Sequence, residues 1–406
     1  MKVLEPRGAH LTYCTNIHPG ESLADVRNAL TYFVPEIKQR VSPKADFGVG
    51  LRLAAQAASE LEAPFAIDEL RSLLAREGLF VFTLNGFPYG AFHSTRVKER
   101  VYLPDWLEDR RVSYTHSLAK VLAALLPEGM RGSISTVPGA FAARAAAPDA
   151  GRRLALNIVR SAADLVLLER QTGKTIALAL EPEPACFLEK TSEVVRFFEE
   201  ELWSREARVE LGRLIGLDAD QTEDVLRRHV GICLDACHGS VEFERPKDSL
   251  ATLLAAGIAV PKIQISTGLK LTNPDAAALE ALKAFDDGVY LHQTVVKSRG
   301  RGELAHFVDL PAALAAAQDL GEGAEWRVHF HVPVFESRLG PFSSTQDELI
   351  ELISEAPELA PHLEVETYTF DVLPQEYRVG SVTQAVAREL AWTIGMLARR
   401  SSRDDS

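Results

Sequence analysis

Two short apolar segments of this chain each end at a carboxylate, and this feature constrains the fold most strongly. Residues 176–180 are followed by Glu181, and residues 231–234 are followed by Asp235. A carboxylate that closes a buried strand is costly unless it is hydrogen-bonded, paired or bound to a cation. Where helices separate such strands, this position corresponds to the catalytic end of a β/α barrel.

Strand-like segments alternate with helical ones along the chain, which implies parallel pairing and right-handed crossovers. About ten such segments exceed an eight-stranded barrel by two, and we assign the excess to 262–267 and 289–296, as one barrel strand with a hairpin partner. We therefore expect an α/β fold, a (β/α)8 TIM barrel with a β-hairpin insertion late in the chain. The other segments are 11–16, 47–53, 79–84, 132–136, 176–180, 231–235, 326–332 and 363–369.

No linker or shift in composition divides residues 1–398, which we expect to form a single domain. The charged, serine-rich segment 399–406 is expected to be a disordered tail. The formal net charge of −13 disfavours a nucleic-acid partner, because nucleic-acid binding relies on many basic contacts to phosphates. We find no signal-peptide pattern and no long uncharged apolar stretch, and therefore expect a cytoplasmic protein without membrane insertion.

The faces of the predicted strands indicate a cluster of metal ligands at one end of the barrel. Because side chains alternate along a strand, Glu181, Asp235 and Glu366 are expected to point inward at the carboxyl ends. His329 and His331 share one face of segment 326–332. We expect His331, nearer the carboxyl end, to be the metal ligand and His329 to lie one layer deeper. Three carboxylates and an imidazole suit Mn²⁺, Mg²⁺, Co²⁺, Fe²⁺ or Zn²⁺.

Other polar residues near the expected strand ends could contact a substrate. His238 lies three residues beyond Asp235 and could be a further ligand or a substrate contact. The simpler alternative is that both residues cap the following helix and that Glu181 pairs with an arginine. Loop 85–93, with two glycines, a proline and aromatic residues, suits a polar, ring-shaped ligand or is a plain covering loop. The expected substrate contacts are Asn16, His18, Asn85, His93, Gln264 and His329.

These residues resemble the xylose-isomerase-like barrel superfamily, which includes sugar isomerases, sugar epimerases and endonuclease IV. Its members hold a divalent metal with a glutamate ending strand five, an Asp-x-x-His motif ending strand six, a histidine on strand seven and a glutamate on strand eight. The resemblance assigns Glu181, Asp235 with His238, and Glu366 to three of these positions. The residues open for the strand-seven position are Gln264, His329 and His331.

The chain is also similar, nearly end to end, to the EboE-like barrel proteins of the bacterial Ebo "metabolite traffic" clusters. This resemblance implies a sugar, cyclitol or similar polyol as the small-molecule substrate. It rests on five motifs, namely TYCTNIH at 12–18, NGFPYG at 85–90, LHQ at 291–293, HFHVP at 329–333 and EVETYT at 364–369.

We therefore expect a metal-dependent isomerase or epimerase with catalytic residues Glu181, Glu366 and His238. One alternative is a multi-metal hydrolase resembling endonuclease IV, which needs extra histidines on early strands, where His18 and His93 are the candidates. Another alternative is a carrier that binds a metabolite without converting it. The chain could also form a homo-oligomer.

Overall fold

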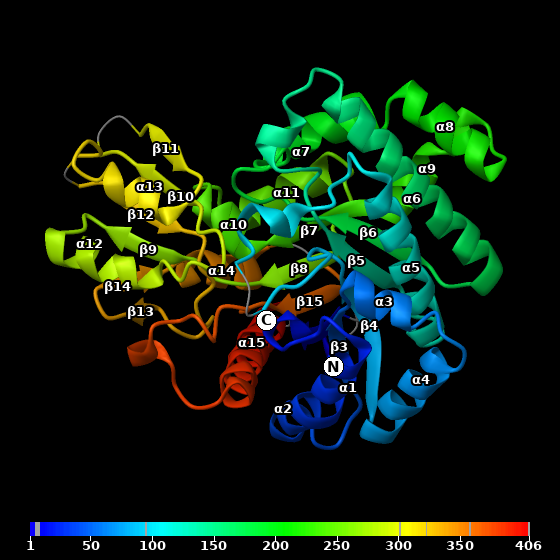
Figure 1. The fold of residues 1–406 in the computed structure, drawn as a ribbon, viewed down its shortest axis with the longest axis horizontal. Coiled ribbons are helices and arrows are strands. Elements are labelled where there is room, and N and C mark those ends of the chain that lie inside the picture. The colour runs from blue at the N-terminus through cyan, green and yellow to red at the C-terminus, as the bar shows by residue number, and fades with distance from the viewer. Residues whose placement is uncertain (5–8, 94–95, 300–301, 322, 357–358, 405–406) are drawn as a thin grey trace.

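The larger of two sheets consists almost entirely of parallel strands (Figure 1). The computed structural model describes residues 1–4, 9–93, 96–299, 302–321, 323–356 and 359–404. The strand order is β1-β2-β15-β8-β7-β6-β5-β4-β3, and only β1 (Lys2–Leu4) pairs antiparallel with its neighbour. The parallel strands are β2 (Ala9–Tyr13), β3 (Phe47–Arg52), β4 (Leu79–Asn85), β5 (Gly132–Thr136), β6 (Ile176–Leu180), β7 (Val230–Asp235), β8 (Lys262–Ile265) and β15 (His362–Val365).

This parallel sheet is curled, so that β2 and β3 approach each other. They meet at a parallel bridge between Cys14 and Gly50. Thr12 links the same two strands, because its Oγ1 donates to Gly48 O over 2.7 Å and accepts from Gly50 N over 3.0 Å. Glycine is required here, since a Cβ on Gly50 would lie 1.8 Å from Oε2 of Glu364. The expected α/β fold with parallel strands is confirmed in the form of this curled sheet.

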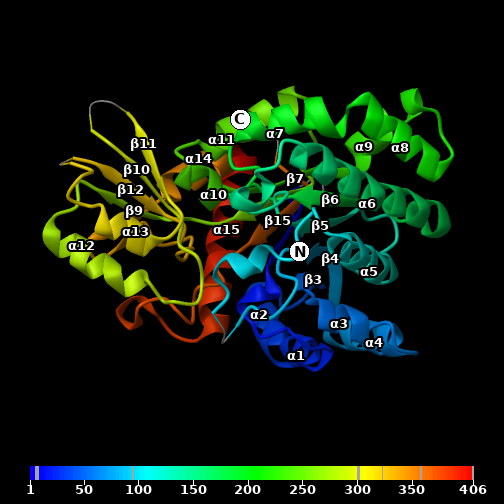
Figure 2. The same ribbon diagram turned by 45° about the horizontal axis from the view of Figure 1, so that its top comes forward.

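Helices follow the parallel strands and pack around the outside of the curled sheet (Figure 2). Their sequences show why. The 23-residue α6, for example, buries Leu154, Ile158, Ala162 and Leu165, whose spacing of three to four residues forms one helical stripe. These helices are α1 (Leu23–Asn28), α2 (Val34–Val41), α3 (Ala55–Glu60), α4 (Ala66–Glu77), α5 (Asp109–Leu125), α6 (Ala150–Thr172), α7 (Thr191–Phe197), α8 (Arg205–Ile215), α9 (Glu223–His229), α10 (Ala236–Val241), α11 (Pro246–Ala255) and α14 (Gln346–Glu355).

A second, antiparallel sheet is inserted between β8 and β15 and replaces the expected hairpin. Its order is β11-β10-β12-β9-β14-β13, and it lies to one side of the curled sheet with α12 and α13 (Figure 1). Its own hydrophobic cluster includes Phe285, Trp326 and Phe330. The elements are β9 (Leu269–Thr272), α12 (Ala276–Leu282), β10 (Thr294–Lys297), β11 (Leu304–Phe307), α13 (Leu310–Ala315), β12 (Glu325–Val328), β13 (Arg338–Leu339) and β14 (Phe342–Ser344).

One strand assignment from the sequence is therefore wrong. Segment 262–267 contains β8 of the curled sheet, as a barrel strand within the excess pair would, whereas segment 326–332, expected in the barrel, contains most of β12 of the second sheet. The error has a physical reason. Alternating polar and apolar residues indicate a half-buried strand, and this pattern is the same in a barrel and in an antiparallel sheet.

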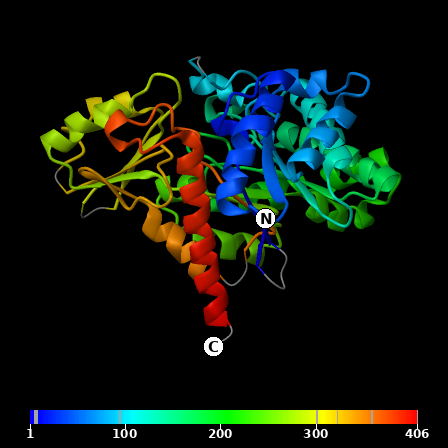
Figure 3. The same ribbon diagram turned by 90° about the horizontal axis from the view of Figure 1, so that it is seen from below.

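The last helix, α15 (Val382–Asp404), packs against α2 and α14 (Figure 3). It continues through most of segment 399–406, where we expected a disordered tail. No helix in the described part of the chain has both the length and the apolar character that crossing a membrane requires.

Candidate metal centre

Three carboxylates converge at the carboxyl ends of β6, β7 and β15. Glu181 follows β6 directly, Asp235 is the last residue of β7, and Glu366 follows β15. Each offers a ligand oxygen within 4.8 Å of the other two, and all three side chains are buried. The structure thus brings together the three carboxylates that the sequence indicates as metal ligands.

Hydrogen bonds hold one oxygen of Glu366 from two sides. Its Oε1 accepts from Nδ2 of Asn16 over 2.7 Å and from Nδ2 of Asn85 over 3.1 Å. The amide of Asn85 is itself oriented, because its Oδ1 accepts from Phe87 N over 3.1 Å. The two asparagines that we expected to contact substrate therefore also fix a candidate ligand.

One carboxylate oxygen of Asp235 caps a helix, and the other has no hydrogen-bond partner. Its Oδ1 accepts from His238 N over 2.9 Å, as the N-cap of α10, and from Oγ of Ser266 over 2.7 Å. The capping alternative is thus correct for this oxygen. Oδ2 of Asp235 is buried without a hydrogen-bond partner, as is Oε2 of Glu181. No arginine pairs with Glu181 in the described part of the chain.

The electrostatics of this cluster suit a cation. Burial, followed by repulsion from Glu366 and Asp235, raises the pKa of Glu181 well above its usual value. Burial, followed by repulsion from Asp235 and Glu364, does the same to the pKa of Glu366. A divalent cation bound among the three carboxylates would offset the repulsion and supply a partner for the two open oxygens. The residues present therefore fit a metal ion.

His331 adds a nitrogen ligand to this group. Its Nδ1 lies 2.8 Å from Glu366 O, and because a carbonyl only accepts, Nδ1 carries the hydrogen. The Nε2 lone pair is then available, and Nε2 is buried without a partner. Burial lowers the pKa of His331 to about 4, so the ring is neutral near pH 7. Together with Asp235 and His238, His331 forms one of the groups whose ligand atoms lie within 4.8 Å of one another.

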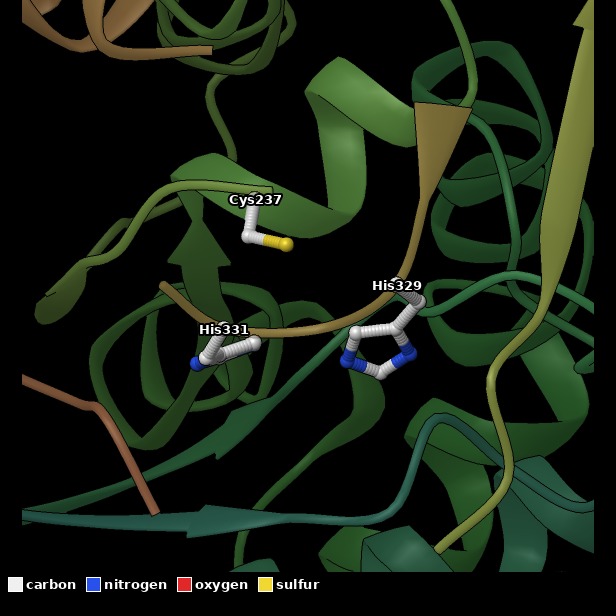
Figure 4. A group of neighbouring side chains, drawn as sticks. All are labelled: Cys237, His329 and His331. Carbon is white, nitrogen blue, oxygen red and sulfur yellow. The ribbon is translucent and has the colours of Figure 1, made fainter. Parts of the chain in front are cut away.

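The route by which His331 reaches the centre differs from our expectation. We placed it on a barrel strand, but it lies on the segment that follows β12 and leaves the second sheet. Figure 4 shows His329 and His331 on this segment, with Cys237 of α10 facing them. Ligand atoms of these three residues also lie within 4.8 Å of one another. The candidates for the position that the resemblance assigns to strand seven thus come from two places, Gln264 from β8 and the two histidines from the segment that follows β12.

His329 is oriented by a chain of hydrogen bonds. Gln293 donates from Nε2 to Pro184 O over 3.0 Å and to Oε1 of Glu183 over 3.2 Å, which directs its Oε1 toward His329. That Oε1 lies 2.8 Å from Nδ1 of His329, so Nδ1 is the donor and the buried Nε2 is left without a partner. We expected His329 to lie one layer deeper than His331. Instead, His329 lines the cavity above the centre.

His238, like His329 and His331, donates from Nδ1 to a carbonyl oxygen. Its Nδ1 lies 2.9 Å from Pro182 O, so Nδ1 donates, and Nε2 lies 3.9 Å from Oδ1 of Asp235. Its ring centroid lies 4.5 Å from that of His329 and 5.7 Å from that of His331. The three imidazole rings thus lie close together.

Glu183 is a site residue that sequence reasoning missed. It is buried, and its Oε1 accepts from the Tyr102 hydroxyl over 2.7 Å and lies 3.4 Å from Nδ1 of His329. Burial raises its pKa. Glu183, His238 and His329 form a further group with ligand atoms within 4.8 Å of one another. The signal was the sequence Glu181-Pro182-Glu183, a second carboxylate two residues beyond the end of the strand.

Three further residues that we expected to contact substrate have other surroundings. Gln264, on β8 beside Asp235, is fully buried, and neither its Oε1 nor its Nε2 has a partner. His18 stacks on Phe33 with ring centroids 4.6 Å apart, and its Nε2 lies 3.0 Å from the Tyr13 hydroxyl. His93 lies 2.6 Å from Asn16 O through Nε2. Of these, neither His18 nor His93 is among the residues that line the cavity in the described part of the chain.

A buried ion pair lies beneath the centre. Nζ of Lys262 on β8 is 2.6 Å from Oε1 of Glu364 on β15, and both side chains are fully buried. Although burial alone would lower it, the pKa of Lys262 is raised, with Glu364 as the main cause of the increase. The ammonium also counteracts the rise in pKa of Glu181 and Glu366. This positive charge offsets part of the repulsion among the carboxylates above it.

Comparisons with known proteins give similarities of fold. Neither a protein-family model nor a curated protein matches this chain. Solved structures with a similar fold include an L-ribulose 3-epimerase, with a TM-score of 0.49 and 11% identity over 98% of this chain and 97% of that one. A xylose isomerase domain protein from Alicyclobacillus acidocaldarius has a TM-score of 0.45 and 14% identity over 96% and 99%. The 3-keto-D-glucoside 4-epimerase YcjR from E. coli has a TM-score of 0.42 and 13% identity over 95% and 97%.

Two of these proteins are described as epimerases and the third as a xylose isomerase domain protein. The resemblance to the Ebo proteins stays a prediction. Because the identities are low, the assignment of the metal centre depends on this chain's own residues.

Proposed function

We propose that this chain is a metal-dependent isomerase or epimerase of a sugar, cyclitol or similar polyhydroxylated metabolite, built as a (β/α)8 barrel. The observation that carries the proposal is the set of open ligand atoms in one buried place. Oε2 of Glu181, Oδ2 of Asp235 and Nε2 of His331 are all buried without partners. Glu181, Asp235 and Glu366 form one group of ligand atoms within 4.8 Å of one another, and Asp235, His238 and His331 form a second. The two groups share Asp235, and joined there they would supply three carboxylates and one neutral imidazole to a metal ion.

A divalent metal bound there would polarise adjacent substrate oxygens and stabilise the negative charge that develops when a neighbouring C–H proton is removed. Glu181 is the better candidate for the base that removes this proton. One of its oxygens would bind the metal and the other would take the proton, and its Oε2 has no hydrogen-bond partner, whereas Oε1 of Glu366 is held by two asparagine amides. Glu366 is the candidate partner that returns a proton. Burial raises the pKa of both carboxyl groups, so each is a stronger base than an exposed carboxylate.

The histidines on the cavity side would orient substrate hydroxyl groups. His238 and His329 each donate from Nδ1 to a fixed acceptor and can accept a hydroxyl hydrogen at Nε2. Asn16 and Asn85 also line the cavity. Since the Nδ1 bonds hold the rings in place, these acceptors are already oriented before substrate binds.

A multi-metal hydrolase is the second candidate, and one observation favours it. Glu183, His238 and His329 form a second possible ligand group beside the first. The histidines of the early strands do not support it, because His18 and His93 have other partners and do not line the cavity. We therefore rank hydrolysis below isomerisation.

Metal content and proton exchange together test the proposal. Purified protein is expected to contain about one tightly bound divalent ion, as measured by elemental mass spectrometry, and Glu181→Gln or Asp235→Asn to lose it. Glu200→Gln, at an exposed position, is the matched control. With ketoses and cyclitol ketones in D2O, NMR should show deuterium entering the carbon beside the carbonyl, and Glu181→Gln should abolish this exchange.

The same experiment separates the alternatives. Binding of a polyol without exchange or conversion would favour a carrier. Cleavage of a phosphodiester or glycosidic bond that requires Glu183 would favour the hydrolase. A protein that binds no divalent ion and is unaffected by both substitutions would end the proposal.

A further inference from the structure

The cavity above the candidate metal centre has two chemically different halves. It encloses about 60 Å³ of open space. Polar groups form its floor, and they are the side chains of Asn16, Asn85, Glu181, Glu183, His238, His329 and Glu366. Apolar and aromatic groups form the rest of the lining, and we call the rings of Phe92, Tyr290 and Tyr368 and the side chains of Val97 and Val101 the aromatic wall.

The aromatic wall is assembled from three distant parts of the chain. Phe92 follows β4, Tyr290 precedes β10, and Tyr368 follows β15. Their ring centroids lie 5.0 Å apart for Phe92 and Tyr290, 5.3 Å for Phe92 and Tyr368, and 5.0 Å for Tyr290 and Tyr368. Phe92, Val97 and Tyr290 also form a separate hydrophobic cluster. The segment that leads into β10 of the inserted sheet therefore contributes Tyr290 to this wall.

Two tyrosines of the cavity lining use their hydroxyls within the protein. Tyr290 donates its hydroxyl to Phe92 O over 3.2 Å. Tyr102 donates its hydroxyl to Glu183 over 2.7 Å. Because these two hydroxyls are engaged, a substrate hydroxyl placed against Phe92 and Tyr290 would lose its hydrogen bonds to water without replacement, which is costly.

Apart from a metal ion at the centre, which the polyol oxygens would occupy, the described lining of the cavity offers no free cation to an anionic group. Among the described residues that line it, Lys98 is the one lysine or arginine. Its Nζ lies 2.6 Å from Oδ2 of Asp309 and 3.8 Å from Oδ1 of Asp286, so its charge is already neutralised. The floor adds carboxylates. A phosphate ester is normally held by free basic side chains or a helix N-terminus, and would be repelled here.

We propose, resting on the function proposed above, that the substrate is an uncharged polyol carrying an apolar substituent, such as an alkyl or aryl ether. The polyol end lies on the polar floor, where the candidate metal ligands are, and the substituent lies along the aromatic wall. Phosphorylated and unsubstituted polyols are poorer ligands, the first because of charge and the second because the wall stays in contact with water. Each methylene buried on the wall should tighten binding about fourfold.

The test compares three probes by isothermal titration calorimetry, namely myo-inositol, its mono-O-benzyl ether and its monophosphate, each with manganese-loaded protein. The ether is expected to bind at least 10-fold tighter than myo-inositol, and the monophosphate more weakly than both. Phe92→Ala should reduce the advantage of the ether to less than about threefold. Val101→Thr, which keeps the side-chain shape, should also reduce it if Phe92→Ala fails to fold. Phe65→Ala, an exposed aromatic residue outside the cavity, is the control and should change nothing.

The outcomes separate this inference from the proposed function. Equal binding of the ether and myo-inositol, tightest binding of the monophosphate, or no binding of any probe would overturn the inference. The ratio of ether to myo-inositol affinity is also measured in Glu181→Gln without metal. If the ether still binds much more tightly than myo-inositol in this variant, the role of the aromatic wall in binding the substituent is supported. If myo-inositol also binds equally well with and without metal, the proposed metal-dependent function is contradicted.

Discussion

His331 donates its Nδ1 hydrogen to the backbone carbonyl of Glu366 over 2.8 Å, and this bond joins two candidate metal ligands that come from different sheets. It selects the tautomer that leaves Nε2 free, and it sets the direction of the ring relative to the carboxylates. The centre is thus organised before any ion binds.

We first predict that His331 is required for metal binding and His329 is not. His331→Gln should lower manganese affinity by more than the roughly 10- to 100-fold that loss of a supporting hydrogen bond costs. His329→Gln should keep the ion, because His329 shares no group of ligand atoms with Glu181, Asp235 or Glu366, whereas His331 shares one with Asp235. Calorimetric titration of the metal-free protein measures both, with the exposed His116→Gln as control. Metal lost in His329→Gln and retained in His331→Gln would reverse the assignment.

The second prediction concerns the closure of the curled sheet. Gly50→Ala should destabilise the protein by more than about 3 kcal/mol, because the new Cβ would meet Oε2 of Glu364 at 1.8 Å and Tyr13 O at 2.8 Å. Gly90→Ala is the matched control, since no atom lies within 4 Å of its added Cβ. Urea denaturation compares the two. Similar stability of both variants would show that β2 and β3 can separate without cost.

Third, the ion pair between Lys262 and Glu364 should show strong coupling. Lys262→Met leaves a fully buried carboxylate without its partner and should cost about 3 to 5 kcal/mol. Adding Glu364→Gln to Lys262→Met should restore a substantial part of this loss. The free energies of unfolding of the two single variants and the double variant form the cycle that measures it. Additive effects would mean that the two charges do not stabilise each other.

Fourth, two buried histidines should make the protein less stable in mild acid. Burial, with a smaller contribution from His93, lowers the pKa of His18 to about 3. Burial, followed by His10 and Lys262, lowers the pKa of His362 to about 3. In the unfolded chain both titrate near pH 6.5. As the pH falls below 6.5, only the unfolded state gains protons, so each histidine should remove about 1.4 kcal/mol of stability per pH unit until about pH 3.

Unfolding in urea at pH 7.5, 6 and 5, with a chelator present, measures this loss. His362→Gln should weaken the pH dependence by the contribution of one histidine, whereas the exposed His116→Gln should leave it unchanged. The same pH dependence of stability in His362→Gln and in the wild type would contradict the prediction.

The sequence predicted the carboxylates of the centre well and the histidines less well, for a physical reason. Glu181, Asp235 and Glu366 each end a strand of one parallel sheet, so their proximity follows from strand direction alone. His331 comes from a different sheet, and no local pattern says which sheet an alternating segment joins. The interaction of Gln293 with Glu183 and His329 likewise depends on tertiary packing between distant segments.

The inserted sheet separates the origin of the candidate nitrogen ligand from that of the candidate oxygen ligands. The oxygens belong to β6, β7 and β15, whereas His331 is delivered by a module that begins after β8 and ends before α14. Exchange or loss of that module in a related chain would therefore change the hardness of the ligand set while leaving the carboxylates in place. Metal preference in such chains can diverge through one exchangeable segment, without a substitution in the parallel sheet.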